Sequence, residues 1–359
     1  MASGRALRVE TPPTRESLGQ GTFVFGDEYE AHGWAPMPDR VPRRGASACS
    51  MAAATFERLE AAGVPTHYRG VVHGDAVQPL DAVDTPPTTL AVKVARVPNL
   101  PYPGGAYDYE SYHREGYTSY LLPLSVVYRH EVPPDSPVRD RARPAEHGLQ
   151  RDEWPAESVT LPEPAIEFVA TQETRERYLD RDEAAEVAGP GDLDRLADLG
   201  REVASVVAAG ASRLTERASA TSEGDYAPST TSPIEVTHQH GRIDVVMDDG
   251  VPTVAGVAGT FDTDRFSAGG LPLSTAFLGA YYREVDPDWV AAVEDAKLRA
   301  RVEDVADWRS LCSVSPKPLP DHVLSAVSKL YASGANAYTG RELFEAPSLA
   351  VAIRRLERL

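Results

Sequence analysis

The sequence predicts an α+β protein with mixed or antiparallel sheets in two subdomains, followed by C-terminal helices. Residues 46–62 form a predicted amphipathic helix with strand-like stretches on both sides. Residues 234–266 contain two predicted strands around a tight turn, and helical patterns dominate the last third of the chain. A chain of 359 residues is long enough to bury more than one core.

The N-terminal part combines one clear helix with several strands. The helix over residues 46–62 ends at Gly63, and Pro65 follows, as is typical of a helix C-terminus. Strands are expected at residues 19–25, 65–72 and 90–97. Residues 1–17 are polar and contain prolines, which favours a loosely held, flexible arm. We therefore predict an arm over residues 1–17 and a small N-terminal lobe over residues 18–98.

The middle of the chain predicts a larger α+β lobe over residues 99–288. It begins with a proline- and tyrosine-rich insertion at residues 99–116. Strands are expected at residues 121–128 and 163–168, and helices at residues 181–188 and 193–218. Residues 219–233 are rich in Ser, Thr, Gly and Pro, a composition typical of a flexible linker.

The C-terminal part predicts a helical extension over residues 289–359. One helix is expected shortly before this extension, at residues 274–282, and one at its start, at residues 287–302. Two more are expected within it, at residues 322–333 and 340–356.

The stretch 234–266 is the most informative part of the sequence. Ile243, Val245 and Met247 alternate with polar or outward positions, which is the period of a strand. The residues 248–250, Asp-Asp-Gly, favour a hairpin turn because Gly tolerates positive φ. The hairpin opens into a loop that ends at Arg265, so carboxylates and an arginine come close together. This pattern indicates a phosphate or metal–nucleotide site; an ordinary exposed acidic hairpin is the alternative.

Composition argues against several classes of partner. The formal net charge of −18 disfavours nucleic acid and acidic membranes. Two cysteines give no disulfide framework, so a reducing cytoplasm is the expected compartment. The sequence has no run of 18 apolar residues and no apolar N-terminal signal. Only four of the 36 basic residues are lysines, although ATP sites commonly use a lysine.

A second candidate phosphate site lies after the strand at residues 121–128. Arg129 ends this strand, and Ser136 lies in the turn that follows. An arginine and a hydroxyl near a turn form a plausible cradle for phosphate oxygens. A solvated loop is the alternative.

Five stretches taken together resemble the SAICAR synthetase (phosphoribosylaminoimidazole-succinocarboxamide synthase) family of purine biosynthesis. The resemblance covers roughly residues 18–288. The stretches are F-V-F-G-D-E-Y with M-P-D-R-V-P-R-R-G, F-E-R-L-E-A-A-G-V-P-T-H-Y, L-P-L-S-V-V-Y-R, E-R-Y-L, and H-G-R-I-D with G-T-F-D-T-D-R-F.

The resemblance implies a two-subdomain fold whose first part is similar to the small lobe of kinases. It also implies ATP and Mg²⁺ in a cleft between the subdomains. Enzymes of this family phosphorylate the carboxylate of an imidazole ribonucleotide, and the amine of aspartate then displaces the phosphate. Metal ions and arginines offset the charge on the moving phosphoryl group.

The family positions that hold the ribose phosphate are kept. They correspond here to Arg129, Ser136 and Arg265. Two arginines and a hydroxyl can hold a dianionic phosphate through charge-assisted hydrogen bonds. The resemblance therefore implies an imidazole ribonucleotide as the small-molecule partner. It leaves homo-oligomer formation open.

The positions near ATP are altered. Asp27 survives from the family motif T-D-R-x-S-x-F-D, but Glu28, Glu30 and Gly33 replace its arginine, serine and second aspartate. A glutamate in place of an arginine reverses a charge, which opposes a triphosphate by on the order of 1 kcal/mol.

The predicted metal ligands are also altered. The family glutamate in D-G-K-x-E corresponds to the shorter Asp244, and the second metal carboxylate falls at about Gly256. A glycine side chain cannot coordinate Mg²⁺. Asp244 is thus the one retained candidate metal ligand, and both ATP and Mg²⁺ become doubtful cofactors.

Three hypotheses follow from this pattern. The first is a diverged paralogue that acts on a phosphoribosyl-imidazole in the biosynthesis of specialised nucleosides, such as the diazepine ring of the coformycin and pentostatin type. Its acid–base candidates are Asp27, His32, His240 and Asp244. The second is a genuine ATP-dependent SAICAR synthetase that joins aspartate to the carboxylated imidazole ribonucleotide, with Glu28, Glu30 or Asp248 in place of the lost metal ligands. The third is a non-catalytic ribonucleotide-binding protein.

Overall fold

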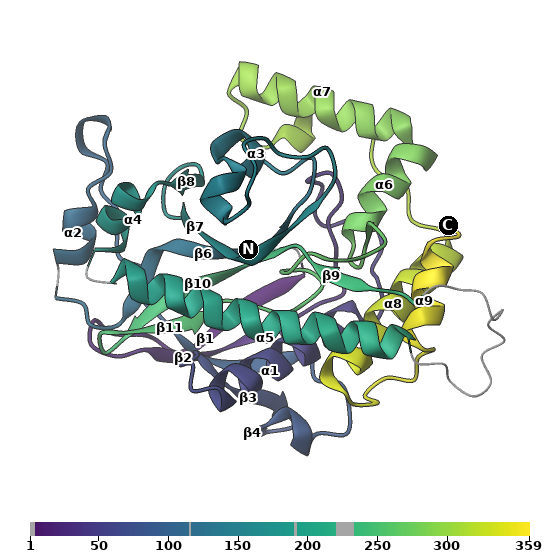
Figure 1. Cartoon of the computed structure of the whole chain (residues 1–359), viewed down its shortest axis with the longest axis horizontal. Coiled ribbons are helices and arrows are strands. Elements are labelled where there is room, and N and C mark those ends of the chain that lie inside the picture. The colour runs from purple at the N-terminus through teal and green to yellow at the C-terminus, as the bar shows by residue number, and fades with distance from the viewer. Residues whose placement is uncertain (1–3, 115, 190–191, 220–232) are drawn as a thin grey trace.

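Two five-stranded antiparallel sheets form the framework of the molecule (Figure 1). The computed structural model describes residues 4–114, 116–189, 192–219 and 233–359. The first sheet contains, in spatial order, β1 (Arg5–Thr11), β2 (Gly19–Phe25), β5 (Thr89–Val94), β3 (Tyr68–His73) and β4 (Ala76–Gln78). The second contains β11 (Val251–Ala255), β10 (His240–Asp248), β6 (Tyr120–Val132), β7 (Val159–Ala170) and β8 (Arg177–Leu179).

Helices pack against these sheets and at their ends. Helix α1 (Arg44–Ala61) lies against the first sheet and α5 (Leu193–Ser219) crosses the second (Figure 1). A third, small sheet contains β13 (Leu271–Pro272), β12 (Phe266–Ala268) and β9 (Val236–His238). The remaining α-helices are α2 (Tyr109–Arg114), α3 (Val138–Arg141), α4 (Arg181–Ala188), α6 (Ala276–Val285), α7 (Pro287–Glu303), α8 (Asp321–Thr339) and α9 (Leu349–Leu356).

The predicted α+β class, with antiparallel sheets and C-terminal helices, is confirmed. The predicted hairpin is present as β10 and β11, which pair from Asp248↔Val251 to Asp244↔Ala255. Across the ranges that the structure describes, no helix combines the length and apolar character needed to cross a membrane.

The prediction of a flexible arm over residues 1–17 is wrong for β1. This strand pairs with β2 from Arg5↔Phe25 to Val9↔Gly21 and forms an edge of the first sheet. Most of its side chains are exposed, so it has none of the apolar alternation that identifies a half-buried strand.

The predicted helix over residues 340–356 begins later than expected. Gly340 adopts φ 80° and ends α8, and Leu349 begins α9 only after Pro347. The predicted insertion at residues 99–116 contains the short helix α2. The predicted linker over residues 219–233 lies almost entirely outside the described residues.

Candidate functional site

One face of the second sheet carries Arg129, His240 and Asp244, three of the side chains predicted to form the site. The opposite face packs on α5, where Gly200 lies so close to Val126 and Ile166 that an added Cβ would come within 2.7 Å of Val126. Successive side chains of a strand point to opposite faces. The register Asp244↔Ser125 and His240↔Arg129 therefore places these four residues together on the face away from α5.

The Asp244 end of this face holds one carboxylate. The Ser125 hydroxyl donates a hydrogen bond of 2.6 Å to Asp244 Oδ1. Gly256 lies beside it, and a Cβ built on that glycine would be 3.0 Å from Asp244 Oδ2. A carboxylate at position 256 would thus lie next to Asp244. Gly256 supplies none, and its φ of 81° disfavours other residues.

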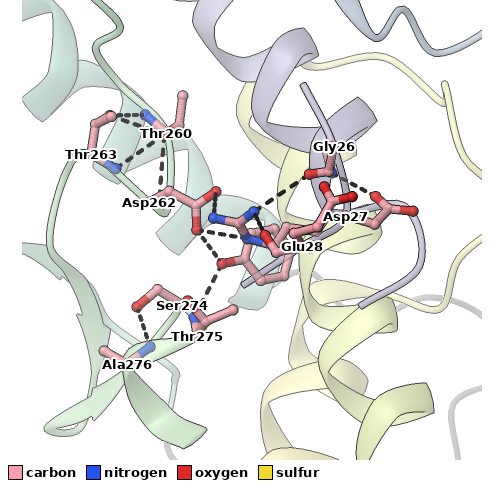
Figure 2. Close-up of polar contacts among 12 residues, drawn as sticks. Gly26, Asp27, Glu28, Thr260, Asp262, Thr263, Ser274, Thr275 and Ala276 are labelled. Atoms are coloured by element: carbon pink, nitrogen blue, oxygen red, sulfur yellow. Dashed lines mark hydrogen bonds and ion pairs between the residues drawn. The ribbon is translucent and has the colours of Figure 1, made fainter. Parts of the chain in front are cut away.

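An ion pair joins α1 to the loop after β11 near this end. Arg44 Nη2 lies 3.1 Å from Asp262 Oδ2, and the two side chains are only 7% and 13% exposed. Arg44 Nη1 also donates to the backbone carbonyls of Gly26 and Glu28. Figure 2 shows Asp262 facing the segment that carries Gly26 and Glu28. The Tyr331 hydroxyl donates to Asp262 Oδ1 at 2.5 Å, so this carboxylate is already well satisfied.

The opposite end of the polar face is rich in positive charge. Arg129 is buried and donates through Nε and Nη2 to Glu167 Oε2 at 3.2 and 3.0 Å. Arg141 binds the other oxygen of Glu167 at 2.6 Å. Arg129 Nη1 has no hydrogen-bond partner among the described residues. Arg265 is exposed, and its guanidinium likewise lacks a partner within the described ranges.

His240 lies between these two arginines. It pairs with Arg129 across the sheet, and its backbone oxygen accepts a hydrogen bond of 2.8 Å from Arg265 N. Burial lowers the pKa of His240 to about 4, and the charges of Arg129 and Arg265 act in the same direction. The ring is therefore neutral at pH 7. Its Nδ1 is buried and has no hydrogen-bond partner among the described residues.

Ser136 lies in the turn before α3 and is buried. Its Oγ accepts a weak hydrogen bond of 3.4 Å from Val138 N. The same helix carries Arg141, which shares Glu167 with Arg129. The structure thus ties the Ser136 turn to Arg129 through Glu167. Its predicted contact with phosphate stays a prediction.

Asp27 and His32 contact segments other than the polar face. Asp27 Oδ1 accepts a hydrogen bond of 2.9 Å from Gly45 N and so holds its loop against the start of α1. His32 Nε2 lies 2.9 Å from Gly279 O on α6, and its ring meets Trp289 edge-on at 5.7 Å. Both side chains thus have structural partners among the described residues. Their catalytic roles stay predictions.

Glu28 was predicted to repel a triphosphate, but its negative charge is partly neutralised in the structure. Its carboxylate forms an ion pair of 2.9 Å with Arg40, an exposed residue of the same loop. This contact offsets part of the predicted repulsion toward a triphosphate.

Comparison with known proteins identifies the family. No family model matches the sequence. A protein of Archaeoglobus fulgidus, provisionally assigned as a phosphoribosylaminoimidazole-succinocarboxamide synthase, is 30% identical over 367 aligned positions. The alignment covers 100% of this chain and 99% of that protein. The chain belongs to the SAICAR synthetase family.

Further SAICAR synthetases share the fold. The Thermoplasma acidophilum phosphoribosylaminoimidazole-succinocarboxamide synthase is 23% identical over 85% of this chain and 88% of its own length. A solved SAICAR synthase superposes with a TM-score of 0.57 at 15% identity, covering 94% of this chain and 96% of the other. The Saccharomyces cerevisiae enzyme in complex with SAICAR gives 0.57 at 14% identity, covering 93% and 96%.

The residues present do not fit the Mg²⁺ site that the SAICAR synthetase family implies. Mg²⁺ requires several oxygen ligands in near-octahedral geometry. Asp244 has no carboxylate neighbour at Gly256, and Asp262 is engaged by Arg44 and Tyr331. Within the described ranges, no group of three or more His, Cys, Asp or Glu side chains could hold a metal ion.

No local sequence pattern predicts the buried network around Asp264. Asp264 is fully buried and accepts hydrogen bonds from Tyr128 Oη, Gly259 N and Thr263 Oγ1. His238 Nε2 lies 3.1 Å from the same carboxylate. These partners come from β6, β9 and the loop after β11, so only the folded chain brings them together. The network fixes the peptide that precedes Arg265.

Proposed function

We propose that this protein is a diverged member of the SAICAR synthetase family that binds a phosphoribosyl-imidazole ribonucleotide and acts on it without ATP and Mg²⁺. The observation that carries the proposal is the contrast between the two ends of the polar face. The Arg129 end has unpartnered donors for phosphate. The Asp244 end has Gly256 where a second metal carboxylate would have to lie.

The phosphate end offers three groups to a dianionic ligand. Arg129 Nη1, Arg265 and the neutral His240 ring each have hydrogen-bonding capacity that no described residue uses. Arginine forks bind phosphate oxygens through charge-assisted hydrogen bonds. The S. cerevisiae relative was solved with SAICAR bound, which supports a ribonucleotide of this type as the ligand here.

The length of β10 suits such a ligand. Asp244 lies four positions after His240, which corresponds to about 13 Å along a strand. A ribonucleotide whose phosphate lies near His240 would direct its base toward Asp244. At that end, Asp244 and the Ser125 hydroxyl form the hydrogen-bonded pair that could exchange a proton with the base.

The reaction we favour is a ring closure or rearrangement that depends on proton transfer. Phosphorylation of a carboxylate needs ATP and a cation, whereas proton transfer needs only groups such as Asp244 and the Ser125 hydroxyl. Formation of a diazepine ring in a specialised nucleoside is the specific form of this proposal.

The second candidate is an ATP-dependent SAICAR synthetase. Identity of 30% over the whole chain to an archaeal relative with that assignment favours it. It requires a cation site made from residues other than the family pair.

One assay separates these functions. Purified protein receives the carboxylated imidazole ribonucleotide, ATP, Mg²⁺ and aspartate, and phosphate release is followed. We expect no turnover, together with ribonucleotide binding by calorimetry. Robust phosphate release would establish the synthetase and overturn the proposal. Ribonucleotide binding without conversion in any ATP-free incubation would indicate a binding protein instead.

A further inference from the structure

A narrow crevice separates the first sheet from the loop after β11. Its lining includes Arg5 from β1, Arg44 from α1, and Thr260 and Asp262 from the loop. The crevice has a volume of about 10 Å³, which is room for roughly one water-sized group. A triphosphate does not fit in this space, whereas one terminal oxygen of a smaller acid group does.

The two arginines of the crevice differ in their contacts. Arg44 neutralises Asp262 directly at 3.1 Å. The Arg5 guanidinium forms no hydrogen bond and no ion pair with another described residue, although Asp262 and Asp244 both act on it electrostatically. Burial lowers the pKa of the Arg5 guanidinium, against the opposing effect of these two carboxylates. Arg5 is thus a desolvated cation whose donors are unused.

An unused, partly desolvated guanidinium favours an anionic ligand. Removing a charged group from water without a partner is costly, and a bound anion offsets that cost. The N–H groups of arginine donate charge-assisted hydrogen bonds to a carboxylate oxygen. The same positive charge disfavours a divalent cation beside Asp244, because like charges repel.

We propose that Arg5 binds the acid group on the base of the ribonucleotide, at the end of the polar face where the family places a metal ion. The ligand class is a phosphoribosyl-imidazole that carries a carboxylate on its ring. Binding of this carboxylate is independent of Mg²⁺. The inference rests on the proposed function, because it places the phosphate of the same ligand at Arg129 and Arg265.

The test compares two probes by calorimetry, an imidazole ribonucleotide with a ring carboxylate and the same compound without it. Each is titrated into wild-type protein, Arg5→Met and Arg8→Met, in buffer with Mg²⁺ and in buffer with EDTA. Arg8 is an exposed residue of the same strand, so Arg8→Met is the matched control.

We expect the wild type and Arg8→Met to prefer the carboxylated probe by about tenfold or more, the effect of a charge-assisted hydrogen bond. Arg5→Met should lose this preference and still bind the probe without carboxylate, which also shows that the variant is folded. EDTA should change neither affinity. Arg5→Lys should keep part of the preference.

Two results would overturn the inference while leaving the proposed function intact. One is an unchanged preference for the carboxylated probe in Arg5→Met. The other is loss of the preference in EDTA with the wild type. Failure of the wild type to bind either probe would instead remove the proposed function, and the inference with it.

Discussion

The Arg44–Asp262 ion pair allows a quantitative prediction about the cleft. We predict that Asp262→Asn destabilises the protein, because it leaves the Arg44 charge buried with a neutral neighbour. Removing one partner of a buried ion pair costs about 3–5 kcal/mol. Arg44 retains the carbonyl oxygens of Gly26 and Glu28, so we expect the lower end, about 3 kcal/mol.

The predicted change is large enough to measure by thermal unfolding. An unfolding entropy of about 2.1 cal/mol/K per residue gives roughly 750 cal/mol/K for 359 residues. A loss of about 3 kcal/mol then lowers the midpoint by about 4 °C. Differential scanning calorimetry of Asp262→Asn at pH 7, with and without excess Mg²⁺, measures this shift directly.

A double-mutant cycle isolates the pair itself. Arg44→Met together with Asp262→Asn removes both charges, so the double variant should be more stable than the sum of the single effects predicts. A shift below about 1 °C for Asp262→Asn, or strictly additive effects, would refute the structural role of the pair. Stabilisation of the wild type by Mg²⁺ that Asp262→Asn abolishes would identify Asp262 as a metal ligand instead.

Three further predictions address the phosphate site, His67, which is a buried residue directly before β3, and the Asp264 network. Arg265→Ala should weaken ribonucleotide binding by about 10- to 100-fold in calorimetry, whereas Arg201→Ala on the surface of α5 should not; equal affinities would remove the phosphate assignment. His67 is buried, and burial lowers its pKa to about 4. The neutral ring therefore contributes to the free energy of unfolding above about pH 6.5, and this contribution is lost as the pH falls from about 6.5 toward 4. His67→Gln should therefore reduce the loss of unfolding free energy between pH 7 and 5 by about 2 kcal/mol, and an unchanged pH dependence would contradict the buried neutral ring. Asp264→Asn weakens four buried hydrogen bonds and should lower the free energy of unfolding by about 2–4 kcal/mol, which lowers the thermal midpoint by several degrees. A midpoint equal to that of the wild type would contradict the structural role of the network.

Local patterns were sufficient to predict most of the elements. Alternating Ile243, Val245 and Met247 predicted β10, and the Asp-Asp-Gly turn predicted the hairpin. Gly63 correctly marked the end of α1 to within a residue or two. By contrast, β1 was missed because its exposed side chains show no period, and the segment after Gly340 was extended into a helix that starts only at Leu349.

The site was predictable only in part, because its contacts are long-range. The resemblance predicted a phosphate site at Arg129 and Arg265, which stays a prediction, and the register of β6 and β10 explains why His240 lies beside Arg129. Arg44 and Asp262 are 218 residues apart in the sequence, so no local pattern predicts their ion pair. Arg5 was assigned to the flexible arm, so its position in the crevice was not foreseen.

The most direct test of the account is a pair of calorimetric titrations on the same wild-type sample. One titrates Mg²⁺–ATP, and the other titrates a phosphoribosyl-imidazole ribonucleotide in EDTA. The account predicts heat of binding for the ribonucleotide and none for Mg²⁺–ATP. Arg129 Nη1 and the Arg265 guanidinium are unpaired among the described residues, while Gly256 and the Arg44–Asp262 pair leave Asp244 without a second free carboxylate for a cation. Micromolar affinity for Mg²⁺–ATP, or ribonucleotide binding only when Mg²⁺ is present, would contradict it.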